Sequence, residues 1–414
     1  MLLISHMRGG NQMNICKKVF CRAYQKIMYV ACFLLPWRKP EILEFDNGVL
    51  GLPQFIKDQG IERVLLVTDE GLKNLGLCDG LVNKCAEVGL NCAWYYKAVP
   101  NPTINNIEDA LKMYKENDCQ AIIAFGGGSP MDCAKGVGAR VACPNKQVPQ
   151  MKGILKVTHK LPPLFAIPTT AGTGSETTLA AVISNPETHE KYPINDPHLI
   201  PKYAVLDATL TTGLPQKITS TTGVDALTHA VEAYIGSANT KETKQMAIDA
   251  VKLIFENLKK AYDNGKDLEA RANMQKAAFY AGVAFTRAYV GNVHAIAHTL
   301  GGFYGVPHGL ANAIILPIML DVYGETAHKK LAELADVVGI EGKDDAEKAT
   351  KFIQAIKDMN EYMAIPKYVE NTIKDEDIPL LAKRAEAEAN PLYPCPKLFD
   401  VEEFKQLYLT IQGK

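Results

Sequence analysis

The sequence predicts an α/β N-terminal domain built on a mostly parallel sheet, followed by an all-helical C-terminal domain. Short apolar runs alternate with helical segments from residue 40 to residue 210, and only helical periodicity continues through 211–414. The chain of 414 residues is also longer than a single hydrophobic core usually holds. Residues 1–39 precede this pattern as an N-terminal extension.

The N-terminal extension is predicted to be partly helical. Its basic residues Lys17, Lys18, Arg22 and Lys26 precede an apolar run at 27–35. Such an order begins a secretory signal, but Pro36 ends the run, no cleavage site follows, and a membrane span needs about 20 apolar residues. We expect an amphipathic helix that packs on the body of the protein or on a neighbouring subunit.

Strands and helices alternate in the predicted α/β domain. The apolar runs at 62–68 and 121–125 are typical of strands buried on both faces, and 93–96 is a third predicted strand. The periodicity predicts helices at 72–88 and 104–116. Parallel sheets of this kind bind ligands at the carboxyl ends of their strands.

The second half of the chain is predicted to contain no strand. Besides the segments that carry its histidines, helices are expected at 241–262, 268–287, 311–323, 329–338, 345–359, 378–389 and 401–412. A helical domain next to an α/β domain offers a small molecule a cleft.

A glycine-rich turn follows the predicted strand 121–125, and it consists of Gly126, Gly127, Gly128 and Ser129. Glycines let a backbone approach a phosphate closely, and Pro130 suits the first position of a helix that Ser129 would cap. Asp132, three residues later, completes a capping-box-like start. The amides of that helix form an anion site fit for a pyrophosphate. A plain tight turn is the alternative, because Met131 breaks the GxGxxG pattern.

Two further features suit a dinucleotide. Asp69 ends the first strand, where a carboxylate binds ribose hydroxyls and repels a 2′-phosphate, which favours NAD over NADP. The alternative interpretation is that Asp69 is only a solvent-exposed residue of a turn. The loop 169–176 offers hydroxyls that can bind ribose, phosphate or carboxamide groups, and they belong to Thr169, Thr170, Thr173 and Ser175. The alternative is that this loop is only a flexible connector.

Three of the nine histidines lie close together, at His294, His298 and His308. His294 and His298 are four residues apart, so a helix would place them on one face. We expect Gly301-Gly302 to break the helix and let His308 fold back. Imidazoles bind zinc, iron, nickel and copper, and such a site needs a carboxylate or water as well.

A carboxylate is available in the segment DALTH, where Asp225 and His229 are also four apart. Two helices that each carry such a pair can face each other across a metal ion. Either pair alone can also arise by chance. A lone buried histidine usually forms only a hydrogen bond to the backbone.

Four segments resemble the iron-containing (group III) alcohol dehydrogenase family: GGGSPMDCAKG, AIPTTAGTGSE, TTGVDALTHAVEAY and HAIAHTLGGFYGVPHGLANA. The likeness runs from about residue 40 to the C-terminus. It implies a Rossmann-like sheet and a dehydroquinate synthase-like architecture. It also implies a divalent metal, Fe²⁺ first and Zn²⁺ second, held by Asp225, His229, His294 and His308. His298 matches a non-ligand histidine near the substrate.

The resemblance also assigns cofactor residues. It implies that the glycine turn contacts the pyrophosphate of a nicotinamide dinucleotide, that Thr169 and Thr170 lie near the nicotinamide, and that Lys191 lies near the cofactor. We expect the metal to polarise the oxygen of a small alcohol or aldehyde while hydride passes between the substrate and the nicotinamide, with His298 relaying the proton. An ordinary surface lysine at 191 and a histidine at 298 that only orients a ligand are the alternatives.

Two other functions fit the same architecture. One is a sugar-phosphate-cyclising lyase like dehydroquinate synthase, which needs several basic residues at the substrate phosphate. The stretch 285–312 offers only Arg287. The other is a non-catalytic filament or scaffold subunit, which would not need an intact set of metal ligands.

Composition limits the partners and the compartment. Lys and Arg number 45 against 46 Asp and Glu, so no broad basic face is offered to nucleic acid or to a membrane surface. Ten cysteines without a CxxC pair fit free thiols in a reducing cytoplasm. The resemblance implies a homodimer or a higher homo-oligomer.

Overall fold

The computed structural model of the protein describes residues 13–35, 37–187 and 190–414. Its larger sheet has six strands in the order β1-β9-β6-β4-β2-β3, and all neighbouring pairs are parallel. The strands are β1 (Glu41–Leu43), β2 (Arg63–Val67), β3 (Asn91–Tyr95), β4 (Ala121–Gly126), β6 (Leu164–Pro168) and β9 (Tyr203–Val205). The predicted parallel sheet is confirmed.

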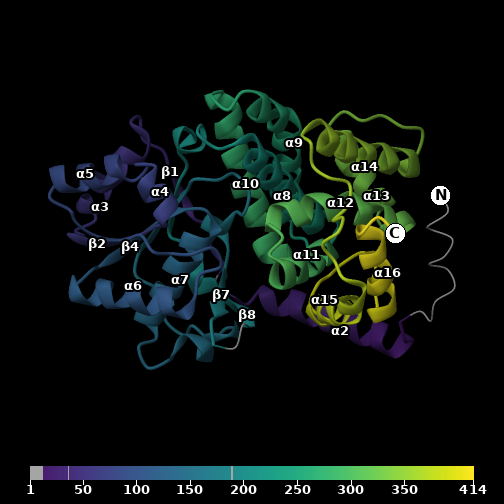
Figure 1. Cartoon of the computed structure of the whole chain (residues 1–414), viewed down its shortest axis with the longest axis horizontal. Coiled ribbons are helices and arrows are strands. Elements are labelled where there is room, and N and C mark those ends of the chain that lie inside the picture. The colour runs from purple at the N-terminus through teal and green to yellow at the C-terminus, as the bar shows by residue number, and fades with distance from the viewer. Residues whose placement is uncertain (1–12, 36, 188–189) are drawn as a thin grey trace. The chain divides into compact units, whose positions relative to one another are not determined.

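Helices cover both faces of this sheet, as Figure 1 shows for α3, α5, α6 and α7. Side chains alternate between the faces of β2: Val64 and Leu66 pack with residues of α3 (Leu52–Asp58) and α5 (Asp79–Glu87). Leu65 and Val67 pack with residues of α6 (Ile104–Glu116) and α7 (Gly128–Ala142). Burial on both faces explains why β2 and β4 are continuously apolar in the sequence.

A smaller sheet contains β5 (Gly153–Ile154), β8 (Glu190–Asn195) and β7 (Ala180–Asn185) in that order. β7 and β8 are antiparallel, whereas β5 and β8 are parallel. The pairing of β7 with β8 is not among the expectations drawn from the sequence.

The second half of the described chain is helical, which confirms the predicted fold class. Its α-helices are α8 (Gln216–Ile235), α9 (Lys241–Asp263), α10 (Leu268–Ala288), α11 (Asn292–Tyr304), α12 (His308–Tyr323), α13 (His328–Val337), α14 (Asp345–Tyr362), α15 (Ile378–Ala389) and α16 (Val401–Ile411).

Two predicted helix boundaries are wrong, and glycine explains both. The predicted helix 72–88 is two helices, α4 (Glu70–Asn74) and α5, because Gly76 between them has a left-handed φ of +69°. The pair Gly301-Gly302 lies inside α11 and does not break it. The chain turns instead at Gly305, whose φ of +67° ends the helix.

An N-terminal helix, α2 (Ile15–Cys32), lies against the C-terminal part of the chain. Arg22 donates hydrogen bonds to the carbonyls of Cys395 and Pro396, and Gln25 donates to those of Pro391 and Tyr393. These contacts join residues more than 360 positions apart. Polar side chains of α2 therefore fix this helix to the C-terminal part of the chain.

The chain divides into two compact units. One contains 37–187, 190–213 and 266–282, and the other contains 13–35, 214–265 and 283–414. The domain boundaries drawn from the sequence, after residues 39 and 210, stay predictions. Among the described helices, none has the length and apolar character that crossing a bilayer requires.

Candidate functional site

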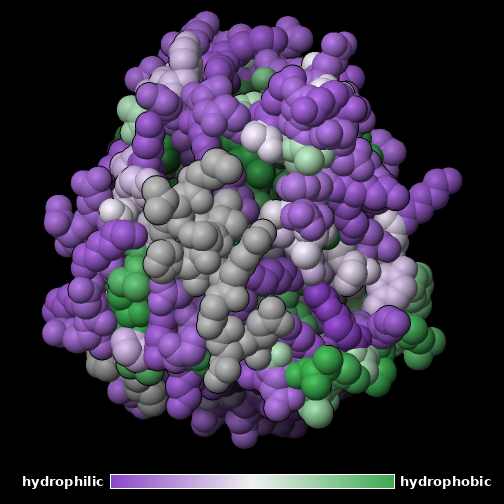
Figure 2. Space-filling model, turned by 90° about the vertical axis from the view of Figure 1, so that its right-hand side faces the viewer, coloured by the Kyte–Doolittle hydropathy of each residue, from purple (hydrophilic) through white to green (hydrophobic). Residues whose placement is uncertain are grey.

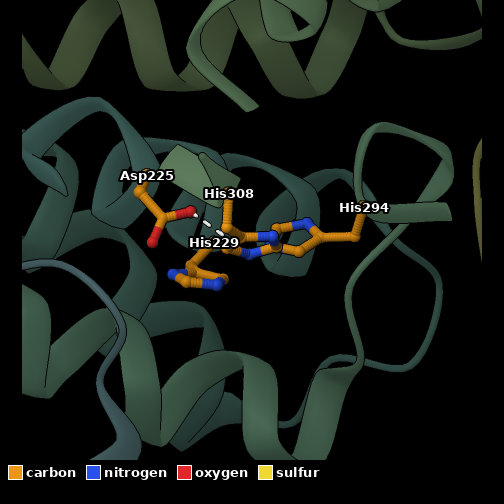
Figure 3. A group of neighbouring side chains, drawn as sticks. All are labelled: Asp225, His229, His294 and His308. Carbon is orange, nitrogen blue, oxygen red and sulfur yellow. Dashed lines mark ion pairs between the residues drawn. The ribbon is translucent and has the colours of Figure 1, made fainter. Parts of the chain in front are cut away.

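Three helices of one unit bring together a carboxylate and three imidazoles. Asp225 and His229 project from α8, His294 from α11 and His308 from the first position of α12, and Figure 3 shows all four side chains converging. Each offers one potential ligand atom, and these four atoms lie within 4.8 Å of one another. The first three side chains are buried and His308 is half-buried. The geometry is that of a candidate metal centre.

The local sequence explains this convergence. Asp225 and His229 are one turn apart on α8 and share a face, as their spacing predicts. The start of α12 reaches α8 because Gly309 follows His308. A Cβ at Gly309 would lie 2.6 Å from the carbonyl oxygen of Thr221 on α8. Only glycine permits this approach of the two helices.

Glu232 orients one of the imidazoles. Its buried carboxylate accepts a hydrogen bond from His294 Nδ1 at 2.6 Å and from the backbone N–H groups of Gly291 and Val293, each at 2.8 Å. Because Nδ1 donates to this carboxylate, the lone pair of His294 is on Nε2, which faces the cluster. Burial raises the pKa of Glu232 to about 8, and the backbone N–H groups of Val293, Gly291 and His294 oppose that rise.

His294 is held in the uncharged form that binds metals. Burial lowers its pKa well below the ordinary value, and the neighbouring imidazoles lower it further. Those neighbours are His229, His308 and His298. A neutral imidazole donates its lone pair to a cation, so the electrostatics of this cluster suit a bound metal ion.

Asn312 provides a test of whether the residues fit a cation. Its amide nitrogen lies 2.6 Å from Asp225 Oδ1 and 3.1 Å from Nε2 of both His294 and His308. Three lone pairs from three helices thus converge on one positively polarised group, as they would on a metal ion. The donor set of three imidazoles and a carboxylate suits iron(II), zinc, manganese or cobalt. The residues therefore fit the implied divalent metal.

His298 is outside the four-residue cluster but touches it. Its ring stacks on that of His308 with the centroids 5.2 Å apart, and its Nδ1 lies 2.6 Å from Glu388 Oε1. Tyr393 donates a hydrogen bond to the same oxygen at 2.8 Å. Because 37% of the His298 side chain is exposed, it is in contact with solvent. Its catalytic role stays a prediction.

The glycine turn of the other unit differs from its predicted form. Helix α7 begins at Gly128 with Gly127 as its N-cap, so Ser129 is not the cap and Pro130 is not the first helical residue. The Ser129 hydroxyl instead accepts a hydrogen bond from the Asn101 backbone N–H at 3.2 Å. Among the described residues, no side chain caps α7. Its first amides can therefore serve an anion.

The threonine-rich loop lies directly against the glycine turn. A Cβ at Gly127 would lie 3.4 Å from Thr170 Oγ1, and one at Gly128 would lie 3.4 Å from Thr173 Cγ2. Thr169 donates its backbone N–H to the carbonyl of the first glycine of the turn at 3.1 Å. Two motifs more than forty residues apart in sequence thus form one surface.

Asp132 and Lys135 hold this loop in place. The Asp132 carboxylate accepts hydrogen bonds from Ser175 Oγ and from the Val182 backbone N–H, each at 3.1 Å, so it does not form the predicted capping box. The buried Lys135 ammonium donates to Ser175 Oγ at 3.1 Å and to Thr178 Oγ1 at 2.7 Å. Burial lowers the pKa of Lys135 to about 8.

The two remaining predicted cofactor residues are Asp69 and Lys191. Asp69, at the carboxyl end of β2, caps α4 by accepting a hydrogen bond from the Leu72 backbone N–H at 2.9 Å. Lys191 Nζ donates to Asn101 Oδ1 at 2.6 Å, and Asn101 is the residue that also contacts Ser129. The roles of both residues as cofactor ligands stay predictions.

Sequence reasoning missed several residues of the site, although spacing could have found two of them. Glu232 is seven residues after Asp225, so a helix places both on one face, and Asn312 is four residues after His308. Glu388 is ninety residues from its partner His298 and carried no local signal.

Two models of known protein families match the sequence of this chain. A family model for iron-containing alcohol dehydrogenases matches residues 40–208. A model for the C-terminal part of the Fe-containing alcohol dehydrogenase family matches residues 219–411. Together these matches cover most of the chain.

Individual proteins agree with the family models. Alcohol dehydrogenase 4 of Saccharomyces cerevisiae is 39% identical over 350 residues, which are 84% of this chain and 90% of that protein. A solved 1,3-propanediol oxidoreductase is 34% identical with a TM-score of 0.86, and the match covers 91% of this chain and 99% of the other.

A third relative was solved with a nucleotide. It is the sulfoacetaldehyde reductase from Bifidobacterium kashiwanohense in complex with NAD⁺, which is 25% identical with a TM-score of 0.82 over 92% of this chain and 99% of its own. The two family models, the identities and the common fold lead to one conclusion: the chain belongs to the iron-containing alcohol dehydrogenase family.

Proposed function

We propose that the protein is a metal-dependent NAD(H) alcohol dehydrogenase and aldehyde reductase that acts on a small primary alcohol or aldehyde. The observation that carries the proposal is the convergence of four potential ligand atoms within 4.8 Å. Its relatives include an alcohol dehydrogenase, a 1,3-propanediol oxidoreductase and a sulfoacetaldehyde reductase, all of which act on an alcohol or aldehyde carbon.

In this proposal Asp225, His229, His294 and His308 hold the divalent metal, Fe²⁺ first and Zn²⁺ second. The bound metal would supply Lewis acidity at the substrate oxygen, and the nicotinamide would supply or accept hydride. Glu232 keeps the Nε2 lone pair of His294 directed at the metal position. The four side chains together present one negative charge, so they offset half the charge of a divalent ion.

The glycine turn and the threonine-rich loop would bind the dinucleotide. Gly126, Gly127, Gly128 and Ser129 present the N-terminal amides of α7 to the pyrophosphate. Thr169, Thr170, Thr173 and Ser175 would contribute hydroxyls and amides, with Asp132 holding the loop and Lys191 close to the helix start. Asp69 would bind the adenosine ribose and disfavour NADP.

His298 would move the proton that accompanies hydride transfer. Its Nδ1 is held by Glu388, which leaves Nε2 to exchange a proton between the substrate oxygen and solvent. Histidine is the side chain that most often transfers protons in enzymes.

The proposal also covers the roles of the domains, the cellular location and the oligomeric state. We assign 40–210 to dinucleotide binding, 211–414 to metal binding and 1–39 to an accessory extension. A cytoplasmic location fits the ten free cysteines, and a homodimer or higher homo-oligomer is proposed from the family. The comparisons do not favour a sugar-phosphate-cyclising lyase or a non-catalytic scaffold.

A single assay tests the activity. The metal-free protein is loaded anaerobically with ferrous ion and mixed with NADH and a panel of short aldehydes, and absorbance of NADH is followed. The proposal expects NADH oxidation that depends on both metal and aldehyde. Uptake of metal and dinucleotide without any aldehyde-dependent oxidation would contradict it.

A further inference from the structure

The N-terminal helix α2 exposes an apolar face. Its exposed large side chains include Ile15 at 75%, Val19 at 64%, Ile27 at 67% and Val30 at 64% of their full surface, and Leu34 just beyond it is 85% exposed. These positions are three, four or eight residues apart, so with the exposed Ala23 they form one stripe along the helix. In Figure 2 hydrophobic residues are exposed low on the molecule, at the height where α2 runs in Figure 1.

The orientation of α2 is the reverse of that of an ordinary surface helix. Its inward face is anchored by polar contacts, from Arg22 and Gln25 to backbone carbonyls and from Lys17 to Glu386. Buried residues on α2 are few: Cys21, Gln25 and Cys32. Surface helices normally bury their apolar stripe and expose their charges. The contacts therefore hold α2 so that its stripe faces outward.

The charge of α2 indicates what covers the stripe. Although the whole chain is nearly neutral, α2 carries Lys17, Lys18, Arg22 and Lys26 and no acidic residue. Among the described residues, neither Lys18 nor Lys26 has an ion-pair partner. A symmetric pair of such helices would place cations opposite cations, which disfavours a second copy. An anionic surface would complement them.

We propose that α2 is a peripheral anchor that lays its apolar stripe into the interface of an anionic lipid bilayer. A helix with an apolar face, lysines beside it and too little hydrophobicity to span is suited to lie in the headgroup region. Phe20, 60% exposed, adds an aromatic side chain to this face. Such binding is peripheral, so it agrees with the lack of a spanning helix among the described residues.

Vesicle sedimentation of the full-length protein tests this proposal. The wild type is mixed with vesicles of phosphatidylcholine alone or of phosphatidylcholine with phosphatidylglycerol, at low and high salt. We expect binding to the anionic vesicles that weakens as salt rises, because screening removes the attraction to the lysines. Equal binding to both vesicles, or to neither, would overturn the proposal.

Two variants separate the apolar and electrostatic contributions. Val19→Glu with Ile27→Glu should lower the partition coefficient into anionic vesicles by about tenfold or more, because two apolar side chains no longer enter the interface. Lys18→Gln with Lys26→Gln should reduce the salt dependence. Leu75→Glu is the matched control, since Leu75 is 74% exposed on a different part of the chain and should leave binding unchanged.

Light scattering of the same variants detects a second copy on this face. All variants should keep the thermal unfolding midpoint and the metal content of the wild type, since the changed side chains are exposed or, at Lys18, half-buried. If the Glu variants halve the molecular mass in solution and vesicle binding is unaffected, the stripe is a protein interface and the lipid proposal is wrong.

Discussion

Glu232 on α8 and His294 on α11 are joined by a hydrogen bond of 2.6 Å between two side chains that are at most 3% exposed. The same carboxylate accepts the backbone N–H groups of Gly291 and Val293 at the start of α11. The Glu232 side chain therefore holds both the start of α11 and the imidazole of His294, which α11 carries. This contact sets the position of one of the four candidate metal ligands.

The first prediction concerns metal affinity at this contact. Glu232→Ala should weaken Fe²⁺ or Zn²⁺ binding by about 10- to 100-fold, because His294 loses the acceptor that orients its ring. Titration calorimetry of the metal-free protein measures this directly. Glu256→Gln, at an exposed position on α9, is the control. Unchanged metal affinity in a folded Glu232→Ala variant would show that the contact serves only stability.

The second prediction concerns the four ligands themselves. Asp225→Asn should reduce the metal that copurifies with the protein and abolish activity, since it removes the only negative charge in the set. His298→Gln should keep its metal. Elemental analysis of the two variants compares them. Equal metal content in Asp225→Asn and wild type would argue against a ligand role.

The third prediction concerns the pair of His298 and Glu388. His298→Gln should lower kcat by about 10²- to 10⁴-fold with little change in KM, which is the usual effect of removing a proton-transfer group. Glu388→Gln should lower kcat less, because the imidazole remains but is held less firmly. Tyr393→Phe removes only the second hydrogen bond to Glu388 and serves as the control. A change confined to KM in His298→Gln would indicate substrate binding instead.

The fourth prediction concerns the choice of nucleotide. Asp69→Ser keeps an N-cap for α4 but removes the negative charge near the expected adenosine ribose. The ratio of kcat/KM for NADPH to that for NADH should rise about tenfold, which corresponds to ~1.4 kcal/mol. Both values come from initial rates with one aldehyde. A constant ratio would assign Asp69 to capping alone.

The fifth prediction concerns stability against pH. Burial raises the pKa of Glu176 to about 7 from an ordinary value of 4.5, and its own backbone N–H and Lys135 oppose that shift. A folded-state pKa above the unfolded value stabilises the protein below pH 4.5, and this contribution disappears as pH rises through 7. Its full extent is roughly 3 kcal/mol.

Urea unfolding of the wild type and of Glu176→Gln tests this sign. Relative to the variant, the wild type should lose free energy of unfolding as the pH rises from 4.5 to 7. The reason is that the glutamine of the variant does not ionise. Glu187→Gln, an exposed position, should behave like the wild type. A wild type that gains stability over the variant as pH rises would show that the Glu176 carboxylate is paired.

The sequence could predict the elements whose physical cause is local. Continuous apolar runs gave β2 and β4, and four-residue spacing placed Asp225 with His229. Helix ends were harder, because they depend on which glycine adopts a left-handed conformation: Gly305 did, and Gly301 did not. Contacts such as that between His298 and Glu388 depend on how distant helices pack, which no local pattern records.

Gly309 has one more consequence. Since its missing side chain allows α12 to touch the Thr221 carbonyl, a contact between main chains fixes how far His308 stands from Asp225. The distance between these two candidate metal ligands therefore depends on the absence of a side chain at position 309. We expect a methyl group at this position to move the four ligand atoms apart and to favour larger ions.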